Sequence, residues 1–76
     1  MDIYILYDPD RGELSYFSLC NPTASCYAIG AWIETEEVQG VVVTTPGCVQ
    51  EAEHLIETEA EHLRDEGTRL YREMCG

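Results

Sequence analysis

The fold is decided first by residues 3–20, which read IYILYDPDRGELSYFSLC. The first part consists of isoleucine, leucine and tyrosine, which alternate between two faces as in a β-strand. The DPDRG segment that follows favours a tight turn, because proline fixes φ, aspartate accepts local hydrogen bonds and glycine adopts positive φ. A second strand is predicted over residues 14–20, with Leu14 and Tyr16 on the opposite face from Phe17. These residues therefore predict an antiparallel β-hairpin.

The C-terminal part predicts one long helix over about residues 48–74. Apolar and small side chains recur there at steps of three and four, which places them on one stripe. The stripe consists of Val49, Ala52, Ile56, Ala60, Leu63, Gly67, Leu70 and Met74. Its small members would let the helix approach a sheet closely. Gly67 lowers helix propensity by about 1 kcal/mol relative to alanine, so the helix could kink or break there.

The middle of the chain supports two interpretations. A strand is predicted over residues 41–45, which read VVVTT. Before it, aromatic and β-branched residues favour a strand over about 26–35, whereas an Asn-Pro pair and three alanines favour a short helix near 22–33. The chain is therefore predicted to be a single α+β domain over 1–76. It has a small antiparallel sheet of three to four strands covered by one long C-terminal helix or, as the alternative, the order ββαβα.

The four cysteines do not predict a disulfide framework. Cys48 and Cys75 lie at opposite ends of the predicted helix, roughly 40 Å apart at about 1.5 Å per residue, which is too far for a disulfide. Cys20 and Cys26 could close a small loop, and their pairing stays open. No histidine lies near them, so no zinc site is predicted. We expect three of the cysteines to be small buried hydrophobes and Cys75 to be a terminal thiol.

The charge balance excludes several classes of function. The chain of 76 residues has 15 Asp and Glu against 4 Lys and Arg, all four of them arginine, for a net charge of −11. Direct binding to nucleic acid or to an anionic membrane needs a basic patch, which this composition does not supply. The chain begins without the features of a signal peptide and has no apolar run long enough to span a bilayer, so a cytoplasmic location is predicted.

Catalysis and metal binding have little support in the sequence. Two Glu-x-x-His motifs, Glu51 with His54 and Glu59 with His62, have the spacing of di-metal helical bundles. Both motifs lie on one predicted helix and point in different directions, and His54 is predicted to face solvent. No serine or cysteine can be placed beside a histidine and an acid. We therefore predict no enzyme, no metal site and no cofactor.

One face of the predicted helix is strongly acidic. Four acids form a row at spacing i, i+4, although each like-charge step destabilises a helix by about 0.2–0.5 kcal/mol. The acids recur about every 3.4 Å along the helix, as charges do along a nucleic-acid strand. The candidate partner-binding residues are the row Glu53, Glu57, Glu61 and Asp65 with the flanking Glu51, Glu59 and Glu66. The alternative is a solvated face that only keeps the protein soluble.

The length, the net charge, this acid row and the lack of a catalytic motif resemble the small acidic inhibitors encoded by phages and mobile elements, of the anti-CRISPR or DNA-mimic type. The resemblance lies in general character, and no motif can be aligned. It implies a stoichiometric inhibitor in the cytoplasm of a host cell. Such an inhibitor would bind the basic nucleic-acid-binding surface of a bacterial defence nuclease or surveillance complex and exclude the nucleic acid.

Two other interpretations stay open. The chain could be a non-catalytic regulatory subunit, antitoxin-like or homodimeric through its sheet edge or long helix, whose acidity is only a solvated surface. Its acidity could also reflect adaptation to a saline solvent. With one helix on one face of the sheet, some tyrosines are expected to face outward, which makes the exposed sheet face a second candidate contact surface.

Overall fold

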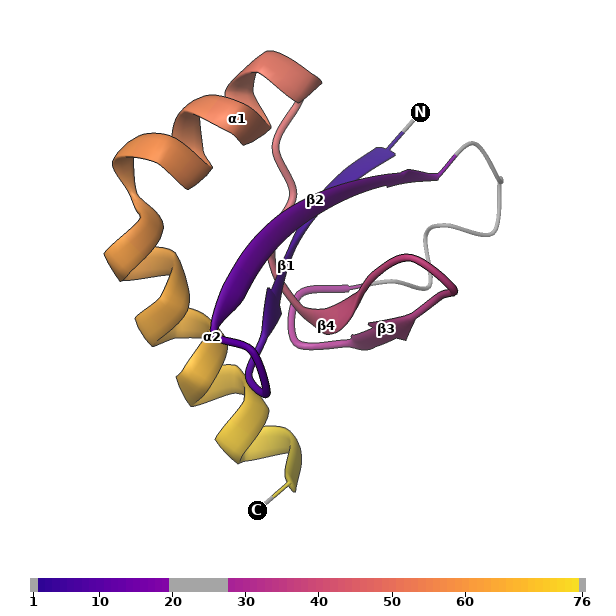
Figure 1. Ribbon diagram of the computed structural model, residues 1–76, viewed down its shortest axis with the longest axis vertical. Coiled ribbons are helices and arrows are strands. Elements are labelled where there is room, and N and C mark those ends of the chain that lie inside the picture. The colour runs from indigo at the N-terminus through magenta and orange to yellow at the C-terminus, as the bar shows by residue number, and fades with distance from the viewer. Residues whose placement is uncertain (1, 20–27, 76) are drawn as a thin grey trace.

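The computed structural model describes residues 2–19 and 28–75, which form a four-stranded antiparallel sheet followed by two helices (Figure 1). The strands are β1 (Asp2–Asp8), β2 (Glu13–Leu19), β3 (Trp32–Glu34) and β4 (Gln39–Thr44). The helices are α1 (Val49–Thr58) and α2 (Ala60–Cys75). The spatial order of the strands is β2-β1-β4-β3, so β2 and β3 form the edges. The predicted α+β class, with a small sheet and a C-terminal helix, is confirmed.

The predicted hairpin joins β1 to β2. Asp8 lies opposite Glu13 and the register runs without interruption along both strands. Gly12 has φ of 69° and donates its backbone N–H to the carbonyl of Asp8 at 2.7 Å. The Asp8 carboxylate accepts the backbone N–H of Asp10 at 3.0 Å. The turn therefore forms by the local hydrogen bonding and positive φ that its sequence predicts.

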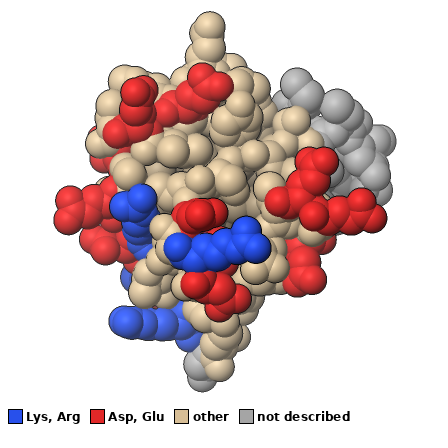
Figure 2. Space-filling model, in the orientation of Figure 1, with Lys and Arg blue, Asp and Glu red and all other residues tan. Residues whose placement is uncertain are grey.

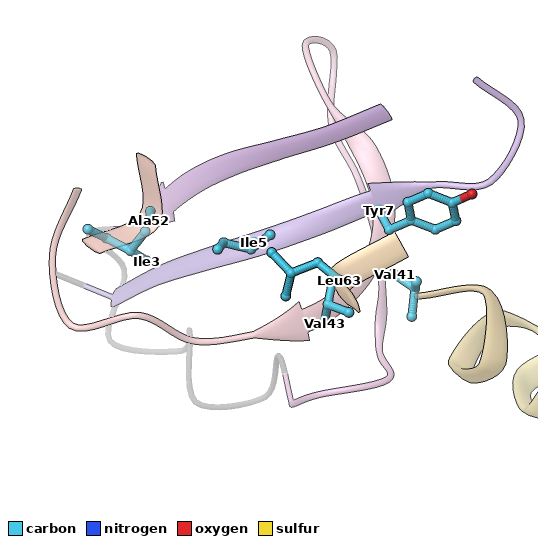
Figure 3. Packing of buried hydrophobic residues seen from close by; sticks show 7 residues of the cluster. All are labelled: Ile3, Ile5, Tyr7, Val41, Val43, Ala52 and Leu63. Atoms are coloured by element: carbon cyan, nitrogen blue, oxygen red, sulfur yellow. The ribbon is translucent and has the colours of Figure 1, made fainter. Parts of the chain in front are cut away.

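Both helices cover the same face of the sheet. The core between them consists of buried side chains from two strands and both helices (Figure 3), namely Ile3, Ile5, Tyr7, Val41, Val43, Ala52 and Leu63. Leu14 of β2 and Leu70 of α2 pack against this cluster as partly buried neighbours. Gly67 of α2 lies against Tyr7, so the predicted close approach of a small residue to the sheet is confirmed at that position.

The opposite face of the sheet carries a second buried cluster of Tyr4, Leu6, Ile33 and Val42, with Phe17 and Val38 packed against it. Tyr4 is only 3% exposed and its ring centroid lies 6.5 Å from that of Phe17. The expectation that this face presents tyrosines to solvent is therefore wrong for Tyr4. The described tyrosine with the greatest exposure is Tyr16, at 39%, and it lies on the helix-covered side.

The middle of the chain contains a shorter strand than predicted. Residues 28–31 form a turn in which Ala31 donates its N–H to the carbonyl of Ala28 at 2.9 Å. Gly30 has φ of 92°, which is compatible with neither a strand nor a right-handed helix. Of residues 28–35 in the predicted strand, only Trp32–Glu34 is a strand, and residues 28–33 of the alternative helix are not helical. The rest of both predictions, with Cys20 and Cys26, lies outside the described residues.

The single helix predicted over 48–74 is two helices that meet at a bend (Figure 1). Glu59 stands between them with φ of −116° and ψ of 21°. Its N–H still donates to the carbonyl of Leu55 at 2.7 Å, and its carbonyl accepts the N–H of Leu63 at 2.9 Å. The bend is therefore a local distortion of one helical path. The break expected at Gly67 is wrong, because that residue lies inside α2 and is buried.

A side-chain hydrogen bond lies next to the bend. The Thr58 hydroxyl donates to the carbonyl of His54 at 2.8 Å, a bond that competes with the helix backbone and often bends helices. Thr68 makes the same bond to Arg64 without interrupting α2, so this bond alone does not set the bend. Both helices pack on the same face of the sheet, α1 before the bend and α2 after it. Neither helix in the described part of the chain is long and apolar enough to cross a membrane.

Candidate protein-binding surface

The seven predicted partner-binding acids lie on the outer side of the two helices. Glu51, Glu53 and Glu57 belong to α1, Glu61, Asp65 and Glu66 belong to α2, and Glu59 is at the bend. All are exposed except Glu66, which is half-buried. Figure 2 shows acidic side chains at the upper left, at the left and right-hand edges and on both sides of the basic side chain in the centre of the visible face. We call the seven residues the acidic helix face.

The bend divides the acidic row. Glu53 and Glu57 remain one turn apart on α1, and Glu61 and Asp65 remain one turn apart on α2. The step from Glu57 to Glu61 crosses Glu59, where the backbone is not helical. The four acids therefore do not form one row with a regular spacing like that of nucleic-acid charges, and this prediction is wrong. The structure instead presents two acidic pairs on two helices that point in different directions.

Three members of the acidic helix face have partners within the protein. The Glu51 carboxylate accepts the N–H of Gly47 at 2.8 Å, and the Glu53 carboxylate accepts the Tyr16 hydroxyl at 3.2 Å. This hydrogen bond, and the charge of Glu53, raise the pKa of Tyr16. Glu66 lies 2.7 Å from the guanidinium of Arg69. The hydrogen bond from that guanidinium lowers the pKa of Glu66.

The carboxylates of four members of the acidic helix face have no hydrogen bond or ion pair with any residue that the structure describes: Glu57, Glu59, Glu61 and Asp65. The last three line a hollow of about 340 Å³ at the bend, together with Thr58 and His62. Ionised carboxylates only accept hydrogen bonds, so such a surface favours guanidinium and ammonium groups. These four carboxylates are free to bind a partner without breaking a contact of the fold.

The histidines and acids do not assemble into a metal site. His54 and His62 are both exposed, as predicted for His54. Within residues 2–19 and 28–75, no group of three or more His, Cys, Asp or Glu side chains could hold a metal ion. No buried side-chain nitrogen or oxygen in this part of the chain lacks a hydrogen-bond partner.

Cys48 has a role that the sequence analysis missed. It is exposed, so the prediction that it is a buried hydrophobe is wrong. It is the N-cap of α1, and its sulfur accepts the backbone N–H of Glu51 at 3.4 Å. The Cys-x-x-Glu spacing is that of a capping box with sulfur in place of oxygen, which is the signal that could have predicted it. Cys75 is a free, exposed thiol, as predicted, and its hydrogen bond raises the pKa of Tyr71.

A groove lies between α1 and β2, beside the acidic helix face. It has a volume of about 440 Å³ and is lined by Leu14, Ser15 and Tyr16 of β2 and by Glu53, Ile56 and Glu57 of α1. The groove thus combines aliphatic and aromatic side chains with two carboxylates. Sequence analysis did not identify it, because it depends on which strand α1 lies over.

Exposed carboxylates of the acidic helix face lie beside a groove that also carries aliphatic and aromatic side chains. No family model, no curated protein and no solved structure matches the chain. The acidic helix face and the groove beside it are therefore the surfaces on which a function can be argued.

Proposed function

We propose that this protein is a non-catalytic acidic inhibitor, anti-CRISPR-like, that binds the basic nucleic-acid-binding surface of a bacterial defence nuclease or surveillance complex. The observation that carries the proposal is the set of four exposed carboxylates, Glu57, Glu59, Glu61 and Asp65, without a partner among the described residues. They lie together at the bend of the helices in a chain with a net charge of −11.

The cost of this arrangement supports a function in binding. Like charges one helical turn apart destabilise a helix, and α1 and α2 each carry such a pair, Glu53 with Glu57 and Glu61 with Asp65. Arg69 is the cation placed between two acids of α2, and it pairs with Glu66 and Glu73, outside the unpaired set. A basic partner would relieve the repulsion in the unpaired set and gain charge-assisted hydrogen bonds.

Electrostatic complementarity gives the mechanism. A surface with several exposed carboxylates accelerates encounter with a basic surface and favours the correct orientation. Arginines and lysines that hold a nucleic-acid backbone would bind these carboxylates instead, so the inhibitor and the nucleic acid would exclude each other. The affinity must fall as salt screens the charges.

The test is capture from a bacterial lysate at low salt, with two matched variants. One variant carries Glu57→Gln, Glu61→Gln and Asp65→Asn, and the control variant carries Glu13→Gln, Glu36→Gln and Glu37→Gln. The three acids of the control are also exposed and lie in β2 and in the turn after β3. Both variants lose three negative charges from a net charge of −11, and circular dichroism checks that both are folded.

We expect the wild-type protein and the control variant to capture a nucleic-acid-binding protein that salt releases and added nucleic acid displaces. The helix-face variant should lose this capture. Equal capture by the two variants would remove the acidic helix face from the mechanism. Partners that resist salt and ignore nucleic acid would favour a regulatory subunit whose acidity is a solvated surface.

A further inference from the structure

β2 is an edge of the sheet that no strand of the described residues covers. β2 has seven residues, Glu13–Leu19, and pairs with β1 on one side. On its other side it pairs with no strand among residues 2–19 and 28–75. Natural edge strands are usually blocked by proline, bulges, charge or short length. β2 contains no proline, pairs with β1 in continuous register and has one charged residue, Glu13, at its first position. The opposite edge, β3, is only three residues long.

The groove beside this edge has the chemistry of a site for a long cationic side chain. Leu14 and Ile56, both partly buried, form its apolar part, and Tyr16 adds an exposed aromatic ring. Glu53 and Glu57 place carboxylates on the side of the groove that α1 forms. Arginine buries an aliphatic stem on apolar surface while its guanidinium binds carboxylate or stacks on an aromatic ring. The groove supplies all three partners: an apolar surface, carboxylates and an aromatic ring.

We propose that β2 and this groove bind an extended segment of the basic partner as an added strand, with arginines at alternate positions. The backbone of the segment pairs with the open edge of β2, and side chains of one face, which recur every second residue, enter the groove. Their stems lie on Leu14 and Ile56, and their guanidinium groups reach Glu53 and Glu57. This inference rests on the proposed function, since it states how the basic partner binds part of the acidic helix face.

Charge favours a basic segment over a second copy of the chain as the strand that pairs with β2. Two copies paired edge to edge would bring together two molecules that each carry a net charge of −11. Each copy would also bring Glu53 and Glu57 to the shared edge. Among the described residues, only the Tyr16 hydroxyl donates a hydrogen bond to the Glu53 carboxylate, and it is neutral. Like charges placed in this way cost binding energy, whereas a basic strand gains it.

The test uses a fluorescent heptapeptide of alternating arginine and valine as the probe, matched in length to the seven residues of β2. Two further probes carry backbone N-methyl groups, one probe on the odd-numbered amides and the other on the even-numbered amides. The methyl groups remove strand hydrogen bonds and keep every charge. A fourth probe has the same composition with its arginines contiguous. Protein variants are Glu53→Gln with Glu57→Gln, and the control Glu36→Gln with Glu37→Gln, which has the same net charge.

We expect N-methylation of one alternate set to weaken binding by about tenfold or more and N-methylation of the other set to change it little, as only one set faces β2. The Glu53 and Glu57 variant should weaken binding of the alternating probe by a similar factor, and the control variant should not. Hydrogen exchange should slow in β2 when the probe is bound.

Four outcomes would overturn the inference. Charge-dependent binding that neither N-methylated probe weakens would leave the proposed function intact and remove the added strand. Absence of binding by the alternating probe would also remove the added strand and leave the proposed function intact. Equal binding by the contiguous probe would have the same consequence. A dimer of the free protein with slowed hydrogen exchange in β2 would assign the edge to a second copy. Failure of the proposed function itself would be seen separately, as lysate capture that the helix-face variant retains.

Discussion

Gly67 of α2 lies directly against the side chain of Tyr7 of β1. A Cβ atom at position 67 would stand 2.5 Å from the Cβ of Tyr7 and 2.6 Å from its Cγ, closer than nonbonded carbon atoms approach. The Cβ of Tyr7 is bonded to the backbone and cannot swing away. The distance between α2 and the sheet is therefore set by the absence of a side chain at this position.

Gly67→Ala is expected to destabilise the protein, although alanine is the better helix former. Its helix propensity favours folding by about 1 kcal/mol, whereas overpacking costs typically about 1–3 kcal/mol and here acts on an immovable neighbour. Urea unfolding followed by circular dichroism measures the balance. Asp65→Ala, at an exposed position of the same helix, should leave stability unchanged or raise it. A Gly67→Ala protein as stable as the wild type would mean that α2 shifts on the sheet at little cost.

Cys48 is predicted to stabilise α1 through its cap. Cys48→Ala removes the acceptor for the N–H of Glu51 and is expected to lower the free energy of unfolding by less than the roughly 0.5–2 kcal/mol of an oxygen cap, because sulfur is a weaker acceptor. Cys48→Ser supplies a stronger acceptor in the same place and should match or exceed the wild-type stability. Thermal unfolding of the three proteins under reducing conditions makes the comparison. Equal stability of the serine and alanine variants would show that the sulfur contributes no cap.

The hairpin and β4 could be predicted from the sequence because their information is local. Strand alternation, the DPDRG turn and the valines of residues 41–43 each act within a few residues. The bend at Glu59 was not predicted, because the apolar stripe keeps its steps of three and four across it. Both helices pack on the sheet, α1 before the bend and α2 after it, and no local pattern contains that arrangement.

The candidate surface could be predicted in part. The steps of three and four on the helices predict which acids point outward, and six of the seven are exposed. Their partners could not be predicted, since the bond from Tyr16 to Glu53 joins residues 37 positions apart. The groove depends on the same placement of α1 over β2. The burial of Tyr4, on the sheet face opposite the helices, could not be predicted either. Strand alternation assigns its side chain to that face but does not show how buried the face is.

Neutralising acids without partners should stabilise the fold. Glu57→Gln with Glu61→Gln removes two charges from a chain of net charge −11, and no described residue loses a hydrogen bond. We expect a higher melting temperature than that of the wild type at low salt, and a difference that shrinks as added salt screens the repulsion. The same variant should bind the basic partner less well. Lower stability of this variant at low salt would contradict the view that these carboxylates repel one another.

Glu66 should behave differently from its neighbour Asp65 as pH changes. The hydrogen bond from Arg69 lowers the pKa of Glu66 in the folded protein. A lowered folded pKa stabilises the protein above the unfolded pKa, and this contribution is lost as pH falls through the folded pKa. Arg69 is exposed and Glu66 is only half-buried, so the effect is expected to be small and sensitive to salt.

The comparison of Glu66→Gln with Asp65→Asn isolates this effect, because each variant removes one negative charge and only the first removes an ion pair. Near neutral pH the Asp65→Asn protein should be the more stable of the two. The melting temperatures should converge at a pH low enough to protonate every carboxyl group, since neither variant then differs from the wild type in charge. A gap between the variants that does not change with pH would assign their difference to packing or helix propensity. An NMR titration of the Glu66 carboxyl, compared with that of an unfolded peptide, checks the direction of the pKa shift directly.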